Sequence, residues 1–95
     1  MPTEAKYETI RTSQFRRDFK RSKKQGKDIS KLIEVVHMLE NGEKLPTNNY
    51  DHSLSGEFAE CRECHLEPDW LLVYSIDEGK LQLHLLHVGT HSELF

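Results

Sequence analysis

The sequence predicts an α+β fold, with two helices near the N-terminus packed on a small antiparallel sheet in the order β-α-α-β-β-β or β-α-α-β-β-β-β. Hydrophobic residues recur at helical spacing in two successive segments between residues 13 and 40. Apolar and β-branched residues fill positions 70–76, and leucines alternate with polar residues from 81 to 85. With 95 residues, the chain is expected to form a single domain over residues 1–95.

The N-terminal half carries the signals of a short strand and two helices. Residues 6–12 contain enough β-formers for a strand. Each helix has a capping residue before it and a glycine stop after it. The caps are Thr12 or Ser13 for the first helix and Asp28 or Ser30 for the second, and the stops are Gln25-Gly26 and Asn41-Gly42. Phe15 and Phe19, four residues apart, share one face of the first helix.

The C-terminal half predicts a loop followed by strands. Residues 43–53 are loop-forming in composition. Strands are expected over 57–66, 70–76 and 81–87, with a hairpin turn at Asp77-Glu-Gly79 whose glycine can adopt positive φ. No run approaches the roughly 20 apolar residues that span a bilayer, and the N-terminus lacks the apolar run of a secretory signal. We therefore expect a cytoplasmic protein without membrane contact.

Charge is distributed unevenly along the chain. Residues 1–31 hold ten Lys or Arg and four Asp or Glu, whereas residues 32–95 hold three and twelve. Five of the six histidines lie between positions 52 and 91. The basic helix is either a solvated face or a surface for a polyanion such as RNA. Its cations are Arg16, Arg17, Lys20, Arg21, Lys23 and Lys24.

Histidines and carboxylates follow several predicted strands and loops. His52 lies in the loop before the sheet, His65 and Asp69 lie near the end of one strand, and His87 and His91 lie near the end of the chain. Because histidine titrates near pH 6.5, such a cluster can supply a base and an acid for RNA transesterification. Each residue also has a simpler interpretation as a surface or turn residue, and a tryptophan such as Trp70 at a strand start is more often core.

The run Cys61-Arg-Glu-Cys64-His65 matches a haem attachment signature and offers soft zinc ligands. Haem attachment requires export, for which the sequence shows no signal, and a structural zinc site usually pairs two such segments. In an extended strand, residues three apart point to opposite faces, so Cys61 and Cys64 should diverge. We therefore expect reduced thiols and no metal or cofactor.

Three motifs together resemble the YafQ branch of the RelE/ParE toxin superfamily. They are Tyr50-Asp-His52-Ser-Leu-Ser-Gly56, then Arg62-Glu-Cys-His65-Leu-Glu-Pro-Asp69-Trp70-Leu-Leu-Val-Tyr74, then Gly89-Thr-His91-Ser-Glu-Leu-Phe95. The resemblance implies a RelE-like, microbial RNase-like fold. It implies a metal-independent, ribosome-dependent mRNA endoribonuclease that cuts mRNA in the ribosomal A site. It also implies a cognate antitoxin, through which the pair would bind operator DNA.

The resemblance also assigns roles by position. His91 would be the general acid, and Asp69 with His65 or His52 would handle the 2′-hydroxyl proton, although the base stays open between them. Trp70, Phe95 and Arg62 would contact substrate. Because the rest of the chain is acidic, ribosome binding would depend on the basic segment over residues 11–31.

His87 departs from the family pattern, which has arginine at this position. Arginine keeps its charge and binds phosphate with two hydrogen bonds, which histidine does less well. If His87 must act as imidazolium, activity should fall steeply as pH rises above about 7. The alternative is a weakly active toxin that serves mainly as an antitoxin partner and transcriptional co-repressor.

Overall fold

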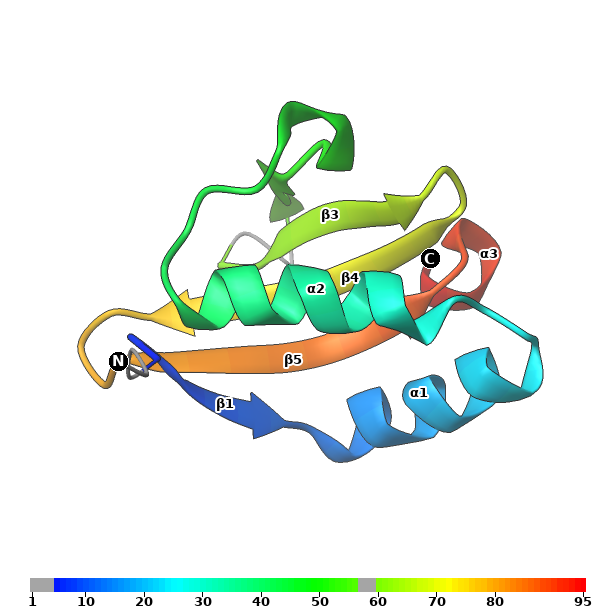
Figure 1. The fold of residues 1–95 in the computed structure, drawn as a ribbon, viewed down its shortest axis with the longest axis horizontal. Helices are drawn as coiled ribbons and strands as arrows, with labels where there is room; N and C mark the ends of the chain where they lie inside the picture. The colour runs from blue at the N-terminus through cyan, green and yellow to red at the C-terminus, as the bar shows by residue number, and fades with distance from the viewer. Residues whose placement is uncertain (1–4, 57–59) are drawn as a thin grey trace.

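The computed structural model describes residues 5–56 and 60–95. The elements follow the order β1 (Glu8–Arg11), α1 (Ser13–Lys24), α2 (Ile29–Glu40), a 3-10 turn η1 (Thr47–Asn49), β2 (His52–Ser53), β3 (Arg62–Glu67), β4 (Trp70–Asp77), β5 (Gln82–Gly89) and α3 (His91–Leu94). The predicted α+β class and the helix pair are confirmed (Figure 1). The strand expected over 57–66 begins at Arg62, and residues 57–59 lie outside the described residues.

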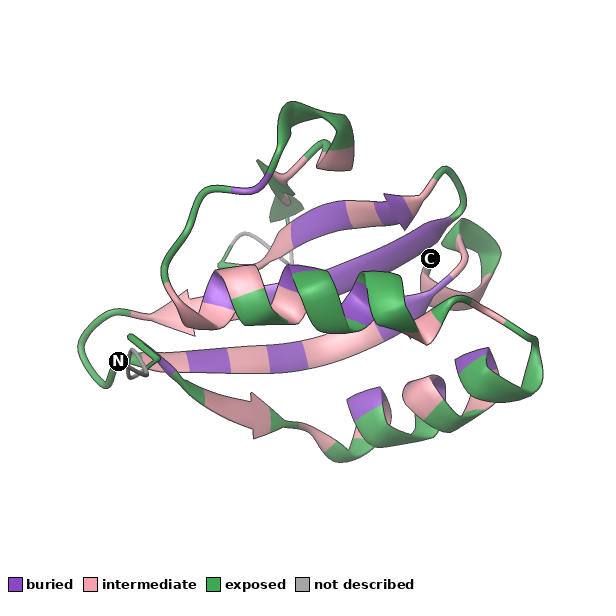
Figure 2. Ribbon diagram, in the orientation of Figure 1, coloured by how far each residue is buried: buried purple, intermediate pink, exposed green. Residues whose placement is uncertain are grey.

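The two long helices begin where their capping residues predict. The Thr12 hydroxyl oxygen accepts a hydrogen bond from the Phe15 backbone N–H at 3.1 Å, and Asp28 does the same for Ser30 at 3.1 Å. These bonds satisfy backbone donors that the first helical turn leaves without partners. Between the capped ends, α1 and α2 each turn apolar residues toward the sheet (Figure 2).

The sheet is mixed rather than purely antiparallel. Its strand order is β1-β5-β4-β3-β2, and β1 pairs with β5 in parallel while the other three pairings are antiparallel. The antiparallel pairing expected for the strands after the helices is confirmed, and β1 adds a parallel edge strand that was not expected. The physical reason is that α1 and α2 lie between β1 and the rest of the sheet in the sequence, and this long connection can return the chain to β5 in either direction.

The main core lies between the helix pair and one face of the sheet. Sheet residues of this face include Cys64, Leu72 and Tyr74, which pack with Phe15 of α1 and Leu32 of α2. Successive strand residues alternate between faces, so the residues between them point to the opposite face, away from α2. That second face carries the candidate site.

Two local features differ from expectation. The β4–β5 turn places positive φ at Leu81 (52°) rather than at Gly79. Residues 91–94, for which no helix was expected, form α3. Thr90 and Glu93 close a capping box around its first turn, so this short helix has a defined start.

No helix within residues 5–56 and 60–95 has the length and apolar character needed to cross a membrane.

Candidate active site

The face of the sheet opposite α2 gathers most of the predicted catalytic residues in two cross-strand rows. His52 pairs with Glu63, Glu63 with Val73, and Val73 with His87, which forms the first row across four strands. His65, Leu71 and Gly89 form the second row. Side chains of directly paired residues share a face. The two rows therefore place three histidines and one glutamate on one surface of the sheet.

Glu63 lies between two of these histidines. One of its carboxylate oxygens is 3.7 Å from His52 Nε2 and 3.9 Å from His65 Nε2, and the residue is only 6% exposed. The carboxylate is therefore close enough to orient both imidazoles. Glu63 is not among the site residues predicted from the sequence. Its position two residues before His65 in a strand, and hence on the same face, was the available signal.

His91 and Asp69 form the best-defined pair of the site. An Asp69 carboxylate oxygen accepts hydrogen bonds from the His91 ring Nδ1 at 2.7 Å and from the His91 backbone N–H at 3.0 Å. The backbone bond first, and the ring bond second, hold the pKa of Asp69 below its usual value. Because the carboxylate engages Nδ1, the Nε2 atom of His91 is left to act on a substrate.

His65 connects the two groups. Its ring centroid lies 5.8 Å from that of His91 and 5.5 Å from that of Tyr50. Its backbone carbonyl accepts a hydrogen bond from the Asn49 side chain at 2.7 Å, which ties β3 to η1. Tyr50 has a left-handed backbone (φ 48°) and is 67% exposed. This exposed aromatic ring beside His65 was not predicted as a site residue.

His52, the histidine of the first motif, has a defined tautomer. His52 Nδ1 lies 2.7 Å from the Tyr50 backbone oxygen, which can only accept a hydrogen bond. Nδ1 therefore carries the hydrogen, and Nε2 of the neutral ring has a free lone pair on the side of Glu63.

The end of β5 and α1 hold His91 in place. Arg21 on α1 forms ion pairs with Glu93 at 3.1 Å and with Asp18 at 3.4 Å, and it donates to the Val88 carbonyl at 3.2 Å. A Cβ atom at Gly89 would lie 2.8 Å from the Arg21 guanidinium, so the glycine permits this close approach. Arg21 was expected among the ribosome-binding cations, but its contacts anchor α3 to α1.

The other five basic residues of α1 remain exposed. Arg17 bonds only to Gln14 of its own helix, at 2.8 Å, and Lys23 lies 5.7 Å from the Phe19 ring centroid. Within residues 5–56 and 60–95, none of the five forms an ion pair with a carboxylate. The five are Arg16, Arg17, Lys20, Lys23 and Lys24.

Two predicted substrate contacts are placed elsewhere. Trp70 is 0% exposed, belongs to the main core, and donates its indole N–H to Ser22 Oγ at 3.2 Å. It therefore presents no ring face to a base, and the core interpretation holds. Arg62 precedes Glu63 in β3 and therefore points to the other side of the sheet, toward α2. There its Nε and one of its terminal nitrogens each donate a hydrogen bond to the Asp51 carboxylate at 3.3 Å. Phe95, by contrast, is 61% exposed at the end of α3.

His87 lies in the first row but turns toward α1. Its Nδ1 atom is 3.4 Å from a carboxylate oxygen of Asp18, which is 1% exposed and also accepts from the Val88 backbone N–H. Two strand spacings, roughly 10 Å, separate the backbone of His87 from that of Glu63. His87, where the resemblance implies arginine, therefore lies on the same face as Glu63, with its imidazole held by a buried carboxylate.

The cysteines do not join His65 in a common site. Cys64 is fully buried opposite Leu72 on the helix side, and burial raises the pKa of its thiol to about 12. Both cysteines are free thiols. The described side chains that can hold a metal ion are instead Glu63, His65 and His91, whose ligand atoms all lie within 4.8 Å of one another. One carboxylate and two imidazoles suit zinc or copper.

This arrangement is suited to acid–base chemistry on an exposed substrate. A buried carboxylate, Glu63, lies between His52 and His65, and this group faces His91, which a second carboxylate orients. The ring centroids of His65 and His91 are 5.8 Å apart, so the two imidazoles can act on opposite sides of one phosphodiester.

The chain is similar to proteins of a known bacterial family. Residues 7–95 match the family model described as "Bacterial toxin of type II toxin-antitoxin system, YafQ". The mRNA interferase toxin YafQ of Escherichia coli (strain K12) is 35% identical over 85 residues, covering 88% of this chain and 90% of that protein. A putative toxin YafQ of Haemophilus influenzae is 33% identical over 87 residues, covering 86% of this chain and 85% of that protein.

Solved structures show the same fold. A metal-bound toxin from Helicobacter pylori superposes with a TM-score of 0.88 at 39% identity, covering 94% of this chain and 99% of that one. The toxin chain of the E. coli DinJ-YafQ toxin-antitoxin complex gives a TM-score of 0.87 at 33% identity, covering 95% and 98%. The chain therefore belongs to the YafQ family of bacterial type II toxins.

Proposed function

We propose that this toxin is a ribosome-dependent mRNA endoribonuclease that acts in the cytoplasm without a metal ion or other cofactor. One observation carries the proposal: the Asp69–His91 pair faces His65 across 5.8 Å, with the buried Glu63 carboxylate behind His65. The family and the mRNA interferase activity named for its E. coli relative support it.

The proposed reaction is transesterification. The ribose 2′-oxygen attacks the adjacent phosphorus, its proton passes to a base, and the bond from phosphorus to the 5′-oxygen breaks. The leaving 5′-oxygen takes a proton from His91 Nε2, giving a 2′,3′-cyclic phosphate and a 5′-hydroxyl end. Asp69 acts as a positioning residue here, because its carboxylate already binds His91. This role differs from the expectation that Asp69 helps to remove the proton of the 2′-hydroxyl.

We assign the base side to His65, supported by Glu63. Of the two histidines beside Glu63, His65 is the one whose ring lies near His91. Its Nε2 atom is 3.9 Å from the Glu63 carboxylate. His52, on the other side of Glu63, would position the carboxylate and the attacking strand. Tyr50 and Phe95 are exposed aromatic rings at the site, suited to stack on bases in place of the buried Trp70.

Binding to the ribosome is assigned to the exposed cations of α1. Their positive charge attracts ribosomal RNA by releasing counterions. Replacing Arg16, Arg17, Lys20, Lys23 and Lys24 with glutamine should weaken ribosome binding and flatten its salt dependence. If this variant binds ribosomes as tightly as wild type does, the cations of α1 are a solvated face and not a ribosome-binding surface.

We further propose that the toxin pairs with a cognate antitoxin, as E. coli YafQ does with DinJ, and that operator DNA is bound only through that complex. A second function, co-repression by a weakly active toxin, is favoured by one observation: His87 replaces the family arginine and is held toward Asp18.

The first experiment is cleavage of mRNA on programmed ribosomes by wild type and His91→Ala, with a chelator present. Cleavage by wild type alone supports the endonuclease, whereas no cleavage by folded wild type leaves co-repression.

A further inference from the structure

The loop between α2 and β2 carries an aromatic side chain that its turn does not require. Tyr50 ends η1 with a left-handed backbone, at φ 48°. Asparagine and glycine adopt this conformation readily, whereas a bulky residue rarely does. Tyr50 is also 67% exposed and is not part of the main core. Because neither the turn nor the core accounts for this ring, its reason is sought at the site beside it.

The loop that carries Tyr50 is fixed to the sheet. Leu45 is buried in the main core just before η1. The Asn49 side chain donates to the His65 carbonyl at 2.7 Å, and the Tyr50 backbone N–H donates to the Thr47 carbonyl at 3.0 Å. In Figure 1 this loop, drawn in green, lies against β3. These contacts hold the ring in one place relative to the candidate active site.

Tyr50 contacts both histidines that flank Glu63. Its ring meets the His65 ring at an interplanar angle of 71°, with 5.5 Å between the centroids. Its backbone carbonyl accepts a hydrogen bond from His52 Nδ1 at 2.7 Å. Tyr50 is therefore attached to the group that removes the proton of the 2′-hydroxyl in the proposed reaction. Because Tyr50 is mostly exposed, its ring is still open to a nucleotide base.

Phe95, which is also exposed, belongs to the acid side of the site. It follows α3, and its backbone N–H donates to the His91 carbonyl at 2.9 Å. In the proposed reaction, His91 protonates the 5′-oxygen of the nucleotide that follows the cut. His65 acts on the ribose of the nucleotide that precedes the cut. The rings of Tyr50 and Phe95 are thus attached to groups that act on different nucleotides.

We propose that Tyr50 stacks on the base of the nucleotide that precedes the cut and carries the attacking 2′-hydroxyl. The base and the 2′-hydroxyl belong to one ribose, so a stack on Tyr50 holds this hydroxyl near His65 and favours its attack. Every base can stack on an aromatic ring, so Tyr50 positions this nucleotide without reading its identity. This role rests on the proposed endonuclease function.

Two substitutions separate the ring of Tyr50 from its backbone. Tyr50→Asn removes the ring, suits the left-handed backbone and keeps the carbonyl that binds His52. It should slow single-turnover cleavage of ribosome-bound mRNA about tenfold, as expected for the loss of one stack between a base and an aromatic ring. Tyr50→Phe keeps the ring and should recover most of the rate. Equal losses in the two variants would assign the effect to the hydroxyl and overturn stacking.

Leu81→Asn is the matched control for the backbone. Leu81 is also exposed and also left-handed, at φ 52°, but it lies in the turn between β4 and β5. This turn precedes β5, whereas α3 and the site follow the end of that strand. The variant should fold and cleave mRNA like wild type. A loss as large as that in Tyr50→Asn would show that the ring is not responsible.

An abasic nucleotide in the mRNA tests which base Tyr50 holds, once the cut has been mapped with wild type. Loss of the base that precedes the cut should slow wild type about tenfold more than it slows Tyr50→Asn, in which the stack is already absent. Loss of the base that follows the cut should slow both toxins by the same factor. If both abasic mRNAs slow the two toxins equally, Tyr50 only supports His65 and the proposal is overturned.

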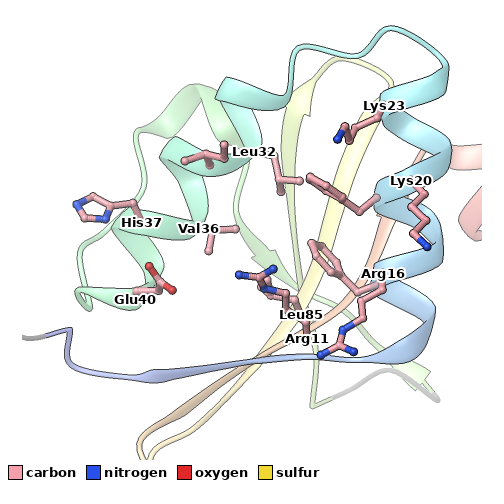
Figure 3. A pocket seen from close by; sticks show the side chains of 12 residues that line it. Arg11, Arg16, Lys20, Lys23, Leu32, Val36, His37, Glu40 and Leu85 are labelled. Atoms are coloured by element: carbon pink, nitrogen blue, oxygen red, sulfur yellow. The ribbon is translucent and has the colours of Figure 1, made fainter.

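Lys20→Gln is the control for weaker ribosome binding. Lys20 projects from α1 beside the groove between α1 and α2 (Figure 3), away from the strand face that carries His65. Its loss of cleavage should be the same with intact and abasic mRNA and should disappear at saturating toxin. The loss in Tyr50→Asn should persist at saturation, because it affects the bound nucleotide. If that loss also disappears, Tyr50 serves docking, and positioning of the nucleotide is overturned.

A binding measurement separates this role from the proposed function. The dinucleotide ApA with a 2′-O-methyl group on its first ribose cannot be cleaved, and it is titrated into the full chain at millimolar concentration. The NMR signals of the Tyr50 ring should shift, and they should not shift with the analogue that lacks the first base. No shift with either dinucleotide overturns the stack. If the signals shift but no toxin cleaves mRNA, the endonuclease proposal fails and the base-binding role of Tyr50 stands.

Discussion

Asp69 accepts two hydrogen bonds from His91 through one carboxylate oxygen, from the ring Nδ1 at 2.7 Å and from the backbone N–H at 3.0 Å. The backbone bond fixes the start of α3 against the β3–β4 turn, and the ring bond fixes the orientation of the imidazole. Asp69 thus fixes the orientation of the His91 ring and determines which of its nitrogens faces the substrate.

This pair predicts different effects for its two members. His91→Ala should lower cleavage about 100-fold or more, because it removes the acid. Asp69→Asn should lower cleavage less and move the pH optimum downward, because the imidazolium loses a neighbouring negative charge. The lowered pKa of Asp69 keeps its carboxylate charged throughout the neutral range, and its charge is lost only as pH falls through that lowered pKa. A pH–rate profile of both variants on programmed ribosomes tests this, and an unshifted optimum in Asp69→Asn contradicts the assignment.

Glu63 predicts a second effect on catalysis. Glu63→Gln keeps the side-chain shape but removes the charge that supports His65, so cleavage should fall about tenfold or more. His65→Ala should cost as much as the glutamine variant or more, and His52→Ala should cost less. Single-turnover cleavage rates rank the three variants. A larger loss in His52→Ala than in His65→Ala would move the base to His52, whose Nε2 also faces Glu63.

The sequence predicted the helices better than the sheet. Helix starts depend on local chemistry, so Thr12 and Asp28 could be selected directly. The parallel pairing of β1 with β5 could not be deduced, because it depends on where a strand returns after two helices. The helix α3 could have been found, since Thr90-His-Ser-Glu93 is a capping-box sequence.

The site was predicted in part for similar reasons. Motif spacing selected His65, Asp69 and His91, which the structure brings together. Glu63 was missed because a single acidic residue in a strand carries no motif of its own. Whether Trp70 is core or contacts substrate depends on which face of β4 the helices cover, and only the folded chain determines that.

His87 predicts a gain of activity by substitution. His87→Arg should raise the cleavage rate about tenfold or more and reduce its decline above pH 7, because a fixed cation on the site face stabilises the charge that develops on the phosphate. The control is His84→Arg, which places the same charge on β5 farther along the strand and should leave the rate unchanged. Cleavage rates from pH 6 to 8.5 decide between them. A wild-type profile that is flat to pH 8.5 would contradict a role for protonated His87.

The ligand trio of Glu63, His65 and His91 predicts inhibition by metal ions. Zn²⁺ or Cu²⁺ bound there would occupy the imidazole lone pairs that carry protons in the reaction. Micromolar Zn²⁺ should therefore suppress cleavage, and a chelator should restore it. Calorimetric titration should show one site in wild type and in His52→Ala and none in His91→Ala. Cleavage that instead requires added metal would refute the metal-independent mechanism.

Trp70 predicts a loss of stability in place of a selective loss of catalysis. The indole is fully buried and bonded to Ser22, so Trp70→Ala should destabilise the protein by about 3–5 kcal/mol. Ser22→Ala leaves the indole N–H without its partner and should cost about 1–3 kcal/mol. Urea unfolding measures both, and the fluorescence of this single tryptophan should resist quenching by iodide. Ser22 is itself fully buried on α1, so it cannot contact substrate. If Ser22→Ala and Trp70→Phe both fold and cleave mRNA like wild type, Trp70 has a structural role in the core. Loss of cleavage in a stable Trp70→Phe would return it to the substrate.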